Sequence, residues 1–186
     1  MPDMSQSSWL WIVVAVGILI VVGLGWFVGY KIAFRRIVRR YLVGMIARRE
    51  NLEASRRALE TVIAHLADAD DEKLMEFAGD AASEDRRTFH EVAQRMGLLR
   101  DELDHMRLPA RVVPVAEQMA DSAYLIALEA GKIHDDMTAD EVLEAVGSID
   151  LSAIWTHLDE TRRVLEATCG EYDIQETAVY GGGLYI

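Results

Sequence analysis

The chain has 186 residues, of which 51% are hydrophobic, and its formal net charge is −12. This length allows one membrane segment and one compact domain of ordinary size, but no second large core. Residues 1–50 carry seven Lys or Arg against Asp3 and Glu50, a net +5, whereas residues 51–186 carry twelve against twenty-nine acids, a net −17. We expect no nucleic-acid binding, because phosphate contacts need clustered cations on the binding face and the larger part is acidic.

The first element is an apolar segment that follows a short N-terminal stretch, residues 1–8. Residues 9–30 contain 22 positions without a charged side chain, and a helix of that length spans about 33 Å, enough to cross a hydrocarbon core. Aromatic side chains lie near both ends, where they anchor membrane helices: Trp9, Trp11, Trp26 and Tyr30. Because residues 1–8 have no basic side chain and the apolar run exceeds that of a signal peptide, the sequence favours a retained transmembrane helix over a cleaved leader.

Within this predicted helix, small residues recur every four positions at Gly25, Gly29 and Ala33. Such a face allows a second membrane helix to approach closely, as in G-x-x-x-G dimers. Glycine is common in membrane helices, so a helix without a partner is the alternative. The spacing therefore predicts a candidate helix–helix packing face in the membrane.

Basic residues follow the apolar segment, and none precede it. The cations nearest to its end are Lys31, Arg35, Arg36, Arg39 and Arg40. This asymmetry predicts an N-terminus outside the cell and a cytoplasmic C-terminal part, which for a bacterial protein means the inner membrane. A bacterial source is itself suggested by sixteen Arg against three Lys.

Residues 31–50 are predicted to form a basic amphipathic neck, with apolar side chains on one side and cations on the other. The apolar side consists of Phe34, Ile37, Val38, Tyr41 and Met45. Each cation near an anionic membrane surface contributes about 1 kcal/mol, so the five cations nearest to the span are expected to bind lipid headgroups. The neck is either a straight stalk or a helix that lies on the membrane, and the pattern does not distinguish the two.

Residues 51–170 are predicted to form an acidic, antiparallel helical bundle, which makes the chain all-α. The apolar spacing predicts helices over 42–66, 71–82, 83–106, 114–132, 138–147 and 150–170. Helix starts are indicated by Ser83, by the capping-box pair Thr138 and Glu141, and by Asp150. The clearest bundle seam, coiled-coil-like in its spacing, consists of Phe89, Val92, Met96, Leu99, Leu103 and Met106.

The last segment, residues 171–186, loses the helical periodicity and contains three consecutive glycines. We expect a flexible tail. Its final residues, Leu184 to Ile186, offer alternate apolar side chains and a free carboxylate of the kind that C-terminal-capture grooves bind, but an unused tail is the simpler reading. Cys169, the only cysteine, is expected to be an inert thiol near a helix C-terminus.

One pair of residues has the spacing of a metal site in a helical bundle, Glu102 and His105 in a Glu-x-x-His arrangement. A di-metal bundle site needs a second such pair, and none of the other histidines has a glutamate three positions before it. On the helical wheel the pair flanks the apolar seam. Glu102 and His105 are therefore weak metal candidates, and no catalytic residue or cofactor is predicted.

From the anchor, the neck and the bundle together, the sequence predicts a single-pass membrane protein whose cytoplasmic domain binds a protein partner or a second copy. An adaptor, an assembly factor or a regulatory subunit fits this description. The alternative is a membrane-tethered metal-binding protein or enzyme that uses Glu102 and His105. A transmembrane receptor is disfavoured because residues 1–8 are too short to form a sensing domain.

Overall fold

The computed structural model describes the backbone of residues 4–174 and the side chains of residues 11 and 14–174. Within residues 4–174 the chain forms six helices and no strand, so the all-α prediction is confirmed. The helices are α1 (Met4–Ala67), α2 (Asp71–Gly79), α3 (Glu84–His105), α4 (Val113–Ala130), α5 (Ala139–Gly147) and α6 (Leu151–Glu171).

The chain divides into two compact units, Met1–Arg40 and Tyr41–Ile186, and α1 contributes residues to both. In the first unit the described side chains from Trp11 to Ala33 are all exposed. This stretch buries nothing inside its own unit because it is a single helix with no second element to pack on.

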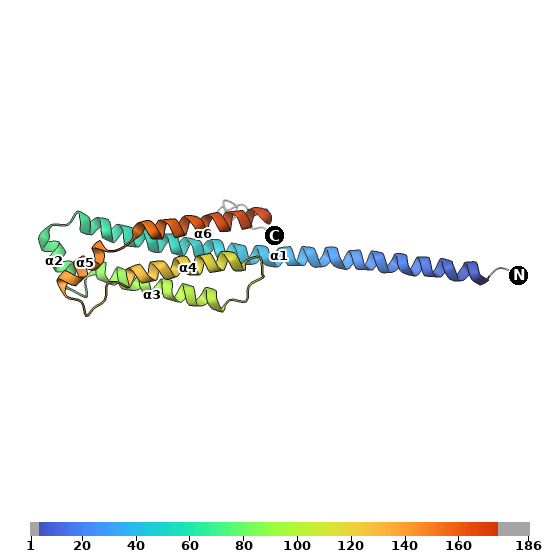
Figure 1. Ribbon diagram of the computed structural model, residues 1–186, viewed down its shortest axis with the longest axis horizontal. Coiled ribbons are helices and arrows are strands. Elements are labelled where there is room, and N and C mark those ends of the chain that lie inside the picture. The colour runs from blue at the N-terminus through green and yellow to red at the C-terminus, as the bar shows by residue number, and fades with distance from the viewer. Residues whose placement is uncertain (1–3, 175–186) are drawn as a thin grey trace. The chain divides into compact units, whose positions relative to one another are not determined.

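The second unit is an antiparallel bundle of four long helices (Figure 1): the part of α1 after residue 40, α3, α4 and α6. The two short helices, α2 and α5, pack on each other at the end where α1 terminates. The connection between α3 and α4, residues 106–112, lies at the opposite end, where the chain enters the bundle. The bundle therefore has an entry end and a closed end, each with its own connections.

Helix α4 packs closely against both α3 and α6. Its buried positions include Ala116, Ala120 and Ala123, and the distance between packed helices falls when the side chains between them are small. In the second unit, this helix is the one with a close neighbour on two sides. Small side chains on α4 thus set the tightest part of the bundle.

The bundle unit begins earlier in α1 than the neck boundary drawn from the sequence at residue 50. Leu42, Met45 and Ile46 are fully buried in the structure. Arg48 and Arg49 follow them on the same helix, and only 9% of Arg49 is exposed. The sequence assigned this stretch to the neck because of its arginines, but its apolar side chains belong to the core of the bundle.

The predicted helix starts agree with the structure. The Ser83 hydroxyl accepts a hydrogen bond from the Arg86 amide (3.4 Å), and the Asp150 carboxylate accepts one from the Ala153 amide (2.9 Å). Thr138 and Glu141 form the reciprocal capping box. Five of the six seam residues of α3 are buried, the exception being Met106 at the C-cap.

The capping box of α5 leads to a pH-dependent prediction. Hydrogen bonds from the amide and the hydroxyl of Thr138, each 2.8 Å from Glu141 Oε2, lower the pKa of Glu141 below its usual value. Because the folded-state pKa lies below the unfolded one, ionised Glu141 stabilises the fold above its unfolded pKa, and this contribution is lost as the pH falls through the folded value. Thr138→Ala is expected to raise the Glu141 pKa, as measured by NMR titration, and to cost about 1 kcal/mol of stability.

The matched control for this experiment is Thr156→Ala. The Thr156 hydroxyl donates to the Ser152 carbonyl within α6 (2.9 Å) and takes no part in the cap of α5. Its removal is expected to leave the Glu141 pKa unchanged. An unchanged Glu141 pKa in Thr138→Ala would contradict the assigned cause of the shift.

Candidate interaction surfaces

The first candidate surface is the apolar half of α1. By length and composition, this helix is able to cross a membrane. Three of the predicted aromatic anchors are exposed, Trp11 at 72%, Trp26 at 80% and Tyr30 at 65%; the side chain of the fourth, Trp9, lies outside the described ones. These large apolar surfaces are costly in water and favourable in a bilayer interface, as the sequence pattern indicates.

The predicted packing face on this helix is open. A Cβ atom added at Gly25 or Gly29 would meet no atom within 4 Å, and Ala33 is exposed. A second helix would therefore meet backbone and small groups along this face. Self-association through Gly25, Gly29 and Ala33 stays a prediction.

The cations that follow the apolar segment are also exposed. These residues are Lys31, Arg35, Arg36, Arg39 and Arg40. The Tyr30 and Phe34 rings stack on the same helix with their centroids 6.3 Å apart. The segment thus has the aromatic and cationic side chains that suit a headgroup layer, and their binding to lipid stays a prediction.

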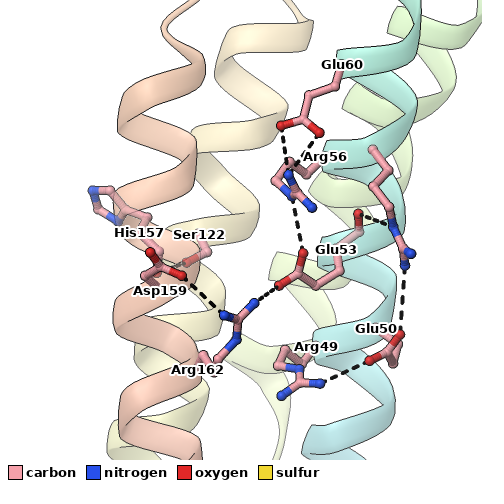
Figure 2. Close-up of polar contacts among 10 residues, drawn as sticks. Arg49, Glu50, Glu53, Arg56, Glu60, Ser122, His157, Asp159 and Arg162 are labelled. Carbon is pink, nitrogen blue, oxygen red and sulfur yellow. Dashed lines mark hydrogen bonds and ion pairs between the residues drawn. The ribbon is translucent and has the colours of Figure 1, made fainter.

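A network of charged side chains joins α1 to α6, and Glu53 is its centre (Figure 2). The Glu53 side chain is only 12% exposed and accepts hydrogen bonds from Arg56 Nε (3.2 Å) and from Arg162 Nη2 of α6 (3.0 Å). Arg56 also donates to Glu60 Oε1 (2.7 Å), and Arg162 lies 3.5 Å from Asp159. Because each buried charge has partners of opposite sign, the network avoids the desolvation penalty of an isolated charge.

The same face carries an aromatic contact. The guanidinium of Arg56 lies over the Trp155 ring, 3.8 Å from its centroid, which is a cation–π geometry. Trp155 is nevertheless 44% exposed. Arg56 therefore contacts α6 through Trp155 and, within α1, contacts Glu53, which Arg162 of α6 also binds, and this role is structural.

A buried polar cluster lies between α4 and α6. The hydroxyls of Ser122 and Thr161 are 2.7 Å apart, so one donates to the other, and both lie within hydrogen-bond distance of the Gln118 carbonyl, at 3.0 and 3.3 Å. The Ser122 hydroxyl makes a further contact with the backbone carbonyl of His157 (3.3 Å), not with its imidazole. Among the described residues this serine thus has hydroxyl and carbonyl partners and lacks the base that a nucleophile requires.

The structure places the two metal candidates of the sequence in other interactions. Glu102 pairs with Arg48 of α1, and His105 Nδ1 lies 2.7 Å from the Asp101 carbonyl of its own helix. The part of the chain that the structure describes contains no group of three or more His, Cys, Asp or Glu residues suited to a metal ion. Through Arg48, Glu102 links α3 to the part of α1 that lies in the bundle.

The closed end of the bundle gathers acids that are far apart in the sequence. Helix α2 has Asp71 and Glu72 in its first turn, and α5, packed on it, has Asp140 and Glu141. Arg86 of α3 is 4% exposed and donates to the carbonyls of Ala78 in α2 (3.3 Å) and of His134 in the connection before α5 (2.7 Å). We call Asp71, Glu72, Asp136 and Asp140, which are all exposed, the acidic end.

Sequence reasoning missed the residues that connect the helices, above all Arg48, Glu53, Arg86 and Arg162. The spacing of Glu53, Arg56 and Glu60 at three and four positions was a usable local signal. The contacts of Arg48 with Glu102 and of Arg162 with Glu53 cross 54 and 109 positions, and no local pattern indicates them.

The remaining sequence predictions concern the end of the chain. Cys169 is buried, with 5% of its surface exposed, and lies at the end of α6. The tail residues Leu184 to Ile186 lie outside the described residues. In comparisons with protein-family models, with curated proteins and with solved structures, the chain matches none.

Proposed function

We propose that this chain is a single-pass membrane protein whose acidic helical bundle is presented in the cytoplasm to a protein partner, as an adaptor, assembly factor or regulatory subunit. The observation that carries the proposal is the composition of α1. This one helix has an apolar half with exposed side chains and a second half whose apolar side chains form the core of a bundle. A membrane anchor and a binding domain that are joined directly through one helix suit a protein that holds a partner at the membrane.

The orientation in this proposal rests on charge. The five exposed cations from Lys31 to Arg40 follow the apolar segment, and none precedes it. Positive flanks stay on the cytoplasmic side during insertion. The proposed location is therefore a cell inner membrane with the N-terminus outside.

The acidic end supports a partner with a basic surface. Its four carboxylates are exposed, whereas the acids of the α1–α6 network are occupied by arginines. Complementary charge increases the association rate and the specificity of a protein interface. The acidic end is thus the surface that we assign to a basic partner.

The experiment that tests the proposal is the isolation of the intact full-length chain from its native membranes in mild detergent, with mass and metal content measured on the same sample. We expect a second protein at fixed stoichiometry. Asp71→Asn combined with Glu72→Gln, Asp136→Asn and Asp140→Asn is expected to lower the recovery of that protein, because it removes four charges from the acidic end.

The matched control neutralises four exposed acids along the bundle, Glu91, Glu117, Asp121 and Glu166, and is expected to retain the partner. A chain that is isolated alone or as a homo-oligomer, with stoichiometric metal, would contradict the proposal. That outcome would favour the metal-binding or enzymatic alternative through Glu102 and His105.

A further inference from the structure

We propose that the connection between α3 and α4 is a second membrane-contact site, at which Arg107 and Arg111 bind anionic lipid headgroups. The contact adds to the one that the neck cations make and sets the orientation of the bundle at the membrane. It rests on the proposed membrane anchor. The sequence pattern gave no reason to group these two arginines with the neck, from which they are about seventy positions distant.

The topology of the bundle brings the connection to the entry end. Residues 106–112 join two antiparallel helices at the end where α1 enters (Figure 1). Tyr41, the first residue of this unit, lies at the same end, and the chain links it to the apolar segment through ten residues, Lys31 to Arg40. The cations on this connection are thus at the end of the bundle that the chain tethers to the apolar segment.

The two arginines are available for such a contact. Arg107 and Arg111 are both exposed, and neither has a hydrogen-bond or ion-pair partner among the described residues. The acids in the last turn of α3 are already engaged, since Glu102 pairs with Arg48 and Asp104 lies 3.7 Å from Arg100. The charge of the two arginines is therefore not neutralised by these neighbours.

The connection is also held in a defined shape. The Val112 amide donates to the Pro109 carbonyl (2.8 Å) and closes a turn, while the Val112 side chain is fully buried. The pyrrolidine ring of Pro109 restricts the backbone further. Because the turn is ordered before it meets a surface, binding costs little conformational entropy. The half-buried Leu108 lies between the arginines in sequence and adds an apolar group beside them.

The contact with lipid would orient the bundle, because its two ends differ in charge. Anionic lipid attracts the entry end through Arg107 and Arg111 and repels the acidic end, which lies at the opposite end of the same bundle. Both effects favour an orientation in which the entry end is directed toward the membrane. The acidic end would then face the aqueous phase, where a basic partner can reach it.

The test uses the full-length chain in lipid nanodiscs of phosphatidylcholine alone or of phosphatidylcholine mixed with phosphatidylglycerol. A fluorophore is attached at Ala110→Cys, next to Arg111, and its quenching by headgroup-labelled lipid reports the docked state. We expect stronger quenching in the anionic discs, with a decrease at high salt. Arg107→Gln with Arg111→Gln is expected to shift the docking equilibrium about thirtyfold toward the undocked state.

The matched control is Lys73→Gln with Arg95→Gln, which removes the same charge from exposed positions on α2 and the middle of α3, and it is expected to leave the quenching unchanged. Equal quenching in the two lipid mixtures, or an equal effect of the two double variants, overturns the inference while the anchor stands. A chain that does not enter the discs overturns the proposed anchor and this inference with it.

Discussion

The double substitution Leu19→Arg with Val22→Arg is expected to release the chain from the membrane. It places two arginines in the middle of the apolar half of α1. An arginine at the centre of a membrane helix costs about 2.5–3.5 kcal/mol on insertion scales. Two of them cost about 5–7 kcal/mol, which lowers the insertion equilibrium more than a thousandfold. Leu19 is 70% and Val22 is 62% exposed, so their unit offers no buried polar partner for the new charges.

The measurement is the fraction of the chain that stays with the membrane after an alkaline carbonate wash. The control Leu19→Phe with Val22→Leu keeps the segment apolar and is expected to remain in that fraction. Labelling of Ser5→Cys and Ala110→Cys with an impermeant maleimide, applied to intact cells, reports the orientation in the same material. Retention of the double arginine variant in the membrane fraction would refute the proposed anchor. Labelling at Ala110→Cys alone would refute the proposed orientation.

The second large effect is expected in the core of the bundle. Phe89→Ala is expected to destabilise the bundle by about 3–5 kcal/mol, because it removes a fully buried ring and leaves a cavity. Phe89 is among the largest fully buried side chains, and its ring lies 6.5 Å from that of Phe77, centroid to centroid. The contact joins α2 to α3, so the loss is expected to loosen the acidic end first.

Urea unfolding of the full-length chain in mild detergent, followed by circular dichroism, gives the change in stability. The matched control is Leu98→Ala on the same helix, where the leucine is 64% exposed and the change is expected to stay within about 0.5 kcal/mol. A loss for Phe89→Ala as small as that of the control would show that the ring is not part of a packed core.

Many of the secondary-structure elements were predictable, because their signals are local. Ser83, Asp150 and the pair Thr138 and Glu141 cap the helices that they were expected to cap. A cap depends on side-chain and backbone groups only a few positions apart, so the sequence contains the whole interaction. The end of α2 at Gly79, three positions before the predicted end, is the kind of boundary that local signals determine weakly.

The candidate sites were less predictable, because their partners come from distant segments. A local spacing made Glu102 and His105 weak metal candidates, and only the fold showed that Arg48 pairs with Glu102 and that His105 lies against the Asp101 carbonyl. Residues 41–50, which include Arg48 and Arg49, were assigned to the neck, yet Leu42, Met45 and Ile46 of this stretch are buried in the bundle. A charge count cannot distinguish a cation that faces lipid from one that pairs with a carboxylate of another helix.

The amino-acid pattern alone established the helical class, the apolar segment with its basic flank and the caps, since each depends on spacing along a single helix. Which charges meet, and at which end of the bundle, depended on the antiparallel packing of helices distant in the chain. That packing joined Glu53 to Arg162, gathered the acids of α2 and α5, and placed Arg107 and Arg111 at the entry end. The physical reason is that helix propensity acts within a few residues, whereas burial selects the neighbours of every helix over the whole chain.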